Sequence, residues 1–106
     1  MAKKNIMLVC SAGMSTSLLV TKMQKAAAEK EVDAHIFAVP ASAVDEHLAK
    51  DEVDVMLLGP QVRYMIGQLE EKVAGKNIPV DIINMQDYGM VNGENVLQVA
   101  LDLINK

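Results

Sequence analysis

The sequence is poor in the residue types on which several common functions depend. It has no tryptophan, aromatic residues make up 3% of its 106 residues, and its net charge is −4 with no long basic run. A nucleic-acid-binding surface is therefore not expected, because such surfaces need clustered positive charge and aromatic platforms for bases. The single cysteine permits no internal disulfide, so nothing indicates an oxidising compartment.

Long hydrophobic runs are missing as well. No apolar stretch approaches the roughly 20 residues that a membrane-spanning helix requires. Lys3 and Lys4 precede a short apolar run, as in a signal peptide, but Ser11, Ala12 and Gly13 end that run quickly. We therefore expect a cytoplasmic protein that does not insert into the membrane.

What the chain does have is enough apolar material for a core. Hydrophobic residues make up 51% of the sequence, and the length suits one compact domain spanning residues 1–106. We find no internal repeat, linker or low-complexity tract. The expected core needs no disulfide and no metal, and we expect no cofactor.

The most informative stretch surrounds Cys10. Residues 6–9 form an apolar run without alternation, which is typical of a strand covered on both faces in a parallel sheet. Apolar positions resume at helical spacing from Leu19 onward. Cys10 is therefore expected at the carboxyl end of a strand, before a helix N-terminus whose free N–H groups bind anions and stabilise a thiolate. The candidate anion-binding loop comprises Ser11, Ala12, Gly13, Met14, Ser15, Thr16 and Ser17.

This loop has an inert interpretation, which the sequence disfavours. A lone cysteine after a strand is often a small core residue. The residues that follow Cys10 are too polar and too small to form a core. The loop also lacks the Gly-Lys-Ser/Thr ending of a Walker A motif and the spacing of a GxGxxG fingerprint.

Strands alternate with helices along the rest of the chain. We expect strands at residues 3–9, 33–39, 54–58 and 79–83, and helices at residues 15–30, 61–73 and 94–104, with a short helix containing Val44 and Leu48. This alternation predicts an α/β fold with parallel strands and right-handed crossovers. The loops that follow the first, third and fourth strands then converge at the carboxyl edge of the sheet, where such folds bind ligands.

Three segments together resemble a known family. Residues 10–20 read Cys-Ser-Ala-Gly-Met-Ser-Thr-Ser-Leu-Leu-Val, which closely resembles the phosphocysteine loop of sugar-specific enzyme IIB proteins. These proteins belong to the bacterial phosphoenolpyruvate-dependent sugar phosphotransferase system, and the similarity is greatest to the lactose/cellobiose/N,N'-diacetylchitobiose group. Residues 55–65, Val-Met-Leu-Leu-Gly-Pro-Gln-Val-Arg-Tyr-Met, and residues 87–93, Asp-Tyr-Gly-Met-Val-Asn-Gly, agree with it.

The resemblance implies a function, a fold and two partners. Cys10 would be a phosphocysteine intermediate that accepts a phosphoryl group from a phosphohistidine of enzyme IIA. It would then pass the group to a sugar, such as the β-linked disaccharides cellobiose, chitobiose or lactose, held by the membrane permease enzyme IIC. The implied fold is a three-layer sandwich with a four-stranded parallel sheet in the order 2-1-3-4, similar to low-molecular-weight tyrosine phosphatases.

A carrier of this kind must contact two partners around its reactive loop. Met14, inside the loop, is a candidate partner contact because methionine is soft and adaptable, whereas Met85, beside a predicted strand, is expected in the core together with Met7 and Met56. Asp87–Gly89 is expected to form a loop. The candidate rim and partner contacts are Gly59, Pro60, Gln61, Tyr64, Asp87 and Tyr88.

The residues themselves are compatible with two other functions. A low-molecular-weight phosphatase or arsenate reductase uses a similar cysteine loop, but it needs an arginine six residues after the cysteine, where this chain has Thr16. Arg63 is the only arginine, and Asp87 is a candidate for the acid of such an enzyme. A non-catalytic binding module is the second alternative. His35 and His47 are expected to be structural, so we reject a Cys–His pair.

Overall fold

The computed structural model describes residues 3–11, 14–50 and 52–105, and for Met14 and Ser15 it describes the backbone alone. The strands are β1 (Lys4–Cys10), β2 (Ala34–Pro40), β3 (Val55–Leu58) and β4 (Val80–Ile82). The α-helices are α1 (Met14–Glu29), α2 (Val44–Lys50), α3 (Ile66–Lys72), α4 (Met85–Gly89) and α5 (Gly93–Ile104). Two 3₁₀ segments, η1 (Ala41–Ala43) and η2 (Pro60–Met65), precede α2 and α3.

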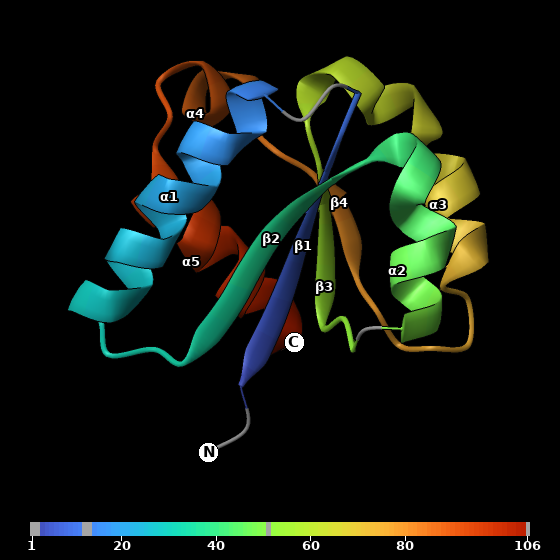
Figure 1. Ribbon diagram of the computed structural model, residues 1–106, viewed down its shortest axis with the longest axis horizontal. Coiled ribbons are helices and arrows are strands. Elements are labelled where there is room, and N and C mark those ends of the chain that lie inside the picture. Colours follow the sequence, from blue (N-terminus) through green and yellow to red (C-terminus); the bar gives the residue numbers. More distant parts are fainter. Residues whose placement is uncertain (1–2, 12–13, 51, 106) are drawn as a thin grey trace.

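The strands form one parallel sheet between two layers of helices. Within the described residues the strand order is β2-β1-β3-β4, and each neighbouring pair runs parallel. Helices α1, α4 and α5 lie on one side of the sheet, and α2 and α3 lie on the other (Figure 1). The predicted three-layer fold with the order 2-1-3-4 is therefore confirmed.

The two central strands explain why the apolar runs show no alternation. Successive side chains of a strand point to opposite faces. Ile6 and Leu8 of β1 join the core beneath α1 and α5, whereas Met7 and Val9 join the core beneath α2 and α3. Because helices cover each face of the sheet, the buried stretches 6–9 of β1 and 55–58 of β3 are apolar throughout.

Close packing of α1 against α5 depends on Gly93. A Cβ atom at this position would lie 2.5 Å from the backbone carbonyl carbon of Lys22 and 2.6 Å from the backbone nitrogen of Met23. Only glycine permits so close an approach at the first residue of α5. The contact fixes α5 against α1, the helix that follows the cysteine loop.

Three details of the expected fold were wrong. The segment expected to be one helix at residues 61–73 begins as 3₁₀ helix, because Val62 has φ −115° and ψ 20° while its side chain is buried in the core. Asp87–Gly89 is the end of helix α4 and not a loop, because the side chain of Asn84 accepts hydrogen bonds from the backbone N–H groups of Gln86 and Asp87. Met85 is exposed and not in the core, because it is the first residue of that helix.

Candidate functional site

Cys10 is the last residue of β1 and is paired in register with Pro40 of β2. The residue is buried, and its Sγ lies 3.7 Å from the backbone carbonyl oxygen of Val39, within the range of an S–H hydrogen bond. The thiol therefore sits at the carboxyl edge of the sheet, as the sequence predicted. It directly precedes the segment that leads into α1.

The loop residues that the structure describes differ in exposure. Ser11 and Ser17 are exposed, whereas Thr16 is completely buried in the first turn of α1. Ala12 and Gly13 lie outside the described residues, as do the side chains of Met14 and Ser15, so their predicted roles stay predictions. What the structure adds is that one hydroxyl of the predicted loop, that of Thr16, faces the protein interior.

Backbone hydrogen bonds bring the ends of three strands together at this edge. The N–H of Gly59 donates to the carbonyl oxygen of Val9 at 2.8 Å, which joins the segment after β3 to the end of β1. The N–H of Ile83 donates to the carbonyl oxygen of Leu58 at 2.8 Å, which joins the segment after β4 to the end of β3. The predicted convergence of these segments is therefore present.

Side chains then connect the converging segments. The Nε2 of Gln61 in η2 donates to the hydroxyl oxygen of Tyr88 in α4 at 2.7 Å. The same hydroxyl lies 3.4 Å from the Oγ1 of Thr16 in α1. Of the predicted rim residues, Gln61 and Tyr88 thus contact each other and reach the cysteine loop. Gly59 is buried beside them and Pro60 is half-buried.

Asp87 and Tyr64 are placed differently. The Oδ2 of Asp87 accepts a hydrogen bond from the Nδ2 of Asn95 in α5 at 2.8 Å, and its backbone N–H is capped by Asn84. These contacts tie Asp87 to the junction of α4 and α5. Tyr64 lies on η2 with its side chain 78% exposed, where it is available to a partner.

Sequence reasoning missed the asparagines that shape this edge. Asn84 caps α4, and the side chain of Asn92 accepts from the N–H of Asn95 at the start of α5. Asn95 in turn holds Asp87. The signal was present in the sequence, because asparagine two or three residues before an N–H is a typical helix cap.

The histidines lie away from the thiol. The ring of His35 stacks on Phe37 with centroids 5.0 Å apart, and Phe37 lies 5.8 Å from the ring of His47. His35 is paired with Asn5, at the amino end of β1, whereas Cys10 is at its carboxyl end. His35 is therefore not placed to pair with the thiol.

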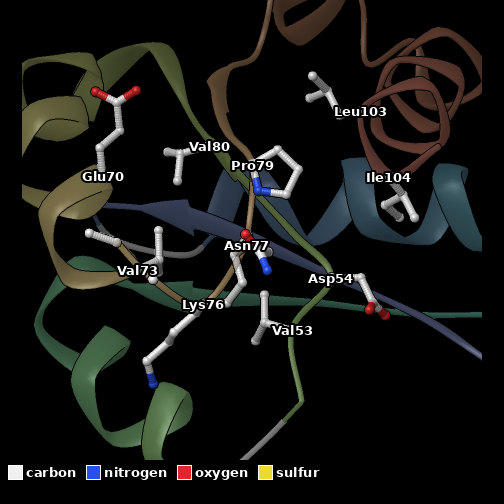
Figure 2. Close-up of a pocket in the computed structure, with 13 residues that line it drawn as sticks. Val53, Asp54, Glu70, Val73, Lys76, Asn77, Pro79, Val80, Leu103 and Ile104 are labelled. Atoms are coloured by element: carbon white, nitrogen blue, oxygen red, sulfur yellow. The ribbon is translucent and has the colours of Figure 1, made fainter. Parts of the chain in front are cut away.

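A cavity of about 710 Å³ lies at the other edge of the sheet. Its lining includes Asp54 before β3, Pro79 before β4, and Glu70 and Lys76 around α3. Figure 2 shows that the charged ends of Glu70 and Lys76 point away from one another, so they do not converge on a common ligand. Because the thiol is at the opposite edge, this cavity is not the candidate active site.

The family to which the chain belongs follows from sequence comparison. Residues 5–99 match the family model described as "PTS system, Lactose/Cellobiose specific IIB subunit". The chain belongs to this family. It is therefore a sugar-specific component of a bacterial phosphotransferase system, as its three segments predicted.

Curated relatives match over 96–100% of their length. The galactose-specific EIIB component of Lactococcus lactis subsp. cremoris is 52% identical over 99% of this chain and 100% of the relative. The cellobiose-specific EIIB component of Lactococcus lactis subsp. lactis is 51% identical with the same coverage. The oligo-beta-mannoside-specific EIIB component of Bacillus subtilis is 41% identical over 95% of this chain and 96% of the relative.

Solved structures agree with the fold. The cellobiose-specific phosphotransferase IIB component of Borrelia burgdorferi has a TM-score of 0.78 and 45% identity, covering 98% of this chain and 94% of that one. The lactose-specific IIB domain of Streptococcus pneumoniae has a TM-score of 0.84 at 16% identity, over 95% of this chain and 97% of that one. The second likeness shows the fold alone.

No helix in the described part of the IIB protein is both long and apolar enough to cross a membrane. Over the same residues, no group of His, Cys, Asp and Glu side chains is arranged to hold a metal ion.

Proposed function

We propose that this IIB protein is a phosphoryl carrier and that Cys10 is its phosphocysteine intermediate. In the first step the thiolate of Cys10 attacks the phosphorus of a phosphohistidine on enzyme IIA. The N–P bond breaks with its electron pair going to the histidine nitrogen, and an S–P bond forms. In the second step a hydroxyl oxygen of a sugar bound to enzyme IIC attacks the phosphorus, the S–P bond breaks and the thiolate is restored. The hydroxyl proton passes to a base on the permease side.

The observation that carries this proposal is the position of Cys10. It ends a central strand, and helix α1 begins shortly after it at Met14. A helix N-terminus exposes free backbone N–H groups to an anion. Membership of the IIB family supports a phosphoryl group as that anion. The candidate phosphate-binding loop remains Ser11, Ala12, Gly13, Met14, Ser15, Thr16 and Ser17.

The buried sulfur of Cys10 lies 3.7 Å from the backbone carbonyl oxygen of Val39. The thiol hydrogen is directed at the carbonyl oxygen of Val39. After deprotonation the sulfur has no hydrogen to donate, and a thiolate and a carbonyl oxygen repel each other. We therefore expect the Sγ of Cys10 to turn away from Val39 and toward the N–H groups of the loop when it reacts.

The loop is suited to carrying a phosphoryl group and not to hydrolysing one. Phosphoryl transfer relies on positioning and on stabilising charge at the phosphoryl oxygens. A guanidinium fork binds two such oxygens at once, but this chain has the neutral Thr16 at the corresponding position and keeps its only arginine, Arg63, on η2. Asp87 is held by Asn95. These features favour a carrier over a phosphatase.

An exposed apolar surface surrounds the site and is suited to partner docking. Leu18 on α1, Tyr64 on η2, and Met85 and Met90 at the two ends of α4 are 53%, 78%, 64% and 71% exposed. The start of α1, helix α4 and the 60–65 segment lie at the same end of the molecule (Figure 1). We call these four residues the apolar rim. Enzyme IIA and enzyme IIC would occupy it in turn, through transient interfaces at the small end of the usual range.

The proposed carrier role also bears on the location of the protein and on its sugar acceptor. Working between enzyme IIA and the inner side of a permease places the protein in the cytoplasm, as one domain over residues 1–106. We propose a β-linked disaccharide such as cellobiose, chitobiose or lactose as the sugar acceptor. Three relatives are named for galactose, cellobiose and oligo-β-mannosides, which are different sugars. The acceptor is therefore best identified by supplying the cognate permease with a panel of sugars.

The decisive experiment is mass spectrometry after incubation with phosphoenolpyruvate, the general phosphotransferase proteins and enzyme IIA. We expect one phosphate, mapped to Cys10, and none on Cys10→Ser. A matched control is the Cys10→Ser/Ser11→Cys variant, which moves the only thiol by one residue to an exposed position and should accept no phosphate. Full labelling of folded Cys10→Ser would refute the proposal. Rapid hydrolysis of the isolated wild-type phosphoprotein would instead favour a phosphatase.

A further inference from the structure

The positive charges of this chain are distributed unevenly over the fold. Because the strands are parallel, the segments that follow them meet at the carboxyl edge of the sheet. These segments are residues 11–17, 41–46, 59–65 and 83–92. Of the ten lysine and arginine residues in the chain, only Arg63 falls within them. The segments that form this edge thus contribute one positively charged side chain.

The charge of Arg63 is not used inside the described part of the fold. The two acidic residues that follow β2 are paired with other cations, Asp45 with Lys72 at 2.7 Å and Glu46 with Lys50 at 3.0 Å. No carboxylate of the described residues lies at ion-pair distance from Arg63, whose side chain is exposed. The guanidinium is therefore available to a molecule that approaches this edge.

Arg63 lies only a few residues from a direct contact with the end of β1. The N–H of Gly59 donates to the carbonyl oxygen of Val9, the residue before Cys10, at 2.8 Å. The four residues from Gly59 to Arg63 span at most about 14 Å, and about 8 Å in 3₁₀ geometry. The Debye length at physiological ionic strength is also about 8 Å. The charge of Arg63 therefore still acts on an anion brought to the cysteine loop.

We propose that Arg63 is a docking residue through which this protein distinguishes phosphorylated from unphosphorylated enzyme IIA. The inference rests on the proposed function and names the chemical feature of the partner that is recognised. A phosphoryl group carries about two negative charges, and the guanidinium attracts them as the donor approaches. Tyr64, the neighbour of Arg63 in the chain, belongs to the apolar rim, so the same partner would cover both side chains.

The same charge favours release of the donor after transfer. Once the phosphoryl group is on Cys10, enzyme IIA has lost the charges that Arg63 attracts, and the attraction between the two proteins disappears. Because Arg63 lies outside the cysteine loop, it acts on the phosphoryl group similarly before and during transfer. Such uniform binding lowers KM without raising kcat. Arg63 is therefore expected to affect the affinity for the donor and not the chemical step.

The test compares the dissociation constants of phosphorylated and unphosphorylated enzyme IIA, measured by NMR titration. Cys10→Ser serves as the starting protein, because it should bind the donor without accepting its phosphoryl group. At an ionic strength of about 0.01 M, adding Arg63→Gln should weaken binding of the phosphorylated form about fourfold. Binding of the unphosphorylated form should not change. Equal losses for the two forms would overturn the proposal, because Arg63 would then contact a fixed group of enzyme IIA, and so would no loss for either form.

Three controls separate the local charge from other causes. Arg63→Lys keeps the charge and should retain most of the affinity, so a loss as large as in Arg63→Gln would overturn the electrostatic explanation. Lys76→Gln removes the same charge at the amino edge, where Lys76 lines the cavity, and should change neither affinity. An equal effect of Lys76→Gln would overturn the proposal by making net charge the cause. The effect of Arg63→Gln should also vanish at about 1 M salt, where the Debye length is about 3 Å, and its persistence there would count against the proposal.

Transfer kinetics provide a second measurement with Cys10 intact. Arg63→Gln should raise the KM for phosphorylated enzyme IIA about fourfold at low ionic strength and leave kcat unchanged. A fall in kcat would overturn the docking role by placing the guanidinium on the reacting group. If the wild-type protein accepts no phosphoryl group, the carrier function fails and this inference fails with it. Normal transfer with identical affinities for wild type and Arg63→Gln would overturn this inference alone.

Discussion

The two edges of the sheet differ in chemistry and in shape. The carboxyl edge carries a buried thiol, a chain of neutral hydrogen-bonding side chains and the exposed apolar rim. The amino edge carries the cavity of about 710 Å³, lined by charged residues such as Asp54, Glu70 and Lys76. This cavity therefore does not lie at the edge that carries the thiol.

This difference agrees with our proposal that a partner completes the site at the carboxyl edge. A protein that binds a small substrate by itself needs a pocket that covers it. In the proposed role, the protein would present its reactive atom to another protein that covers it. We therefore expect changes at the carboxyl edge to affect transfer, and changes at the amino edge to affect stability alone.

The largest effect is expected for Gly93→Ala. This variant tests whether stability and phosphoryl transfer can be changed separately. Its Cβ would lie 2.5 Å from the backbone of Lys22, and backbone cannot give way as a flexible side chain can. We expect a loss of about 2–3 kcal/mol in the free energy of unfolding, measured by urea denaturation. Because α1 follows the cysteine loop, transfer should slow as well. Unchanged stability would show that α1 and α5 leave room for a methyl group at position 93.

Asp54→Ala is expected to lower stability without affecting transfer. Its Oδ2 accepts from the backbone N–H of Asn5 at 2.7 Å, and its own N–H donates to the carbonyl oxygen of Asn5 at 2.8 Å. Removing the carboxylate leaves a half-buried N–H of β1 without this acceptor, at a cost of about 2 kcal/mol. Asp54→Asn keeps an acceptor and should cost less. Equal kcat and KM for the folded variants would support the division between the edges, and slower transfer would break it.

Met90→Gln is expected to weaken docking without affecting stability. The methionine is 71% exposed, so its replacement costs the isolated protein little. If enzyme IIA buries this side chain, its KM should rise about fivefold, or ~1 kcal/mol, with kcat unchanged. Val99→Gln is a suitable control, because Val99 is also exposed but lies on α5, outside the apolar rim. Equal KM values for the two variants would remove Met90 from the docking surface.

The overall fold could be predicted because local signals and burial agree. Residues 6–9 and 55–58 are uniformly apolar since both faces of the sheet are covered, and alternation with amphipathic helices then leaves few topologies. The short helix α4 was not predicted, because five residues carry no periodicity and its formation depends on the side chain of Asn84. Met85 was misplaced for the same reason.

The candidate site was predictable where it is local and not where it is assembled. Cys10 and the segment before α1 are contiguous, so their chemistry can be inferred from neighbouring residues. The contact between Thr16 and Tyr88 joins residues separated by 72 positions, and no local pattern indicates it. The sequence identified Gln61 and Tyr88 only as rim residues, because their mutual hydrogen bond exists only once η2 and α4 are packed side by side.

The smallest expected effect is a gain in stability from Glu31→Gly at the C-terminal end of α1. Glu31 has φ 57°, a left-handed conformation that costs a non-glycine residue about 1 kcal/mol. The N–H of Glu31 donates to the carbonyl oxygen of Ala28 and that of Val32 to Ala27, a helix ending that favours glycine at this position. Because Glu31 is exposed, its side chain contributes little that glycine would lose. We expect the midpoint of thermal unfolding to rise by a few degrees while phosphoryl transfer stays at the wild-type rate. Glu31→Ala, which keeps the Cβ and therefore the strain, should show no such gain. A gain of equal size in both variants would mean that removing a negative charge, and not relieving the backbone, is the cause.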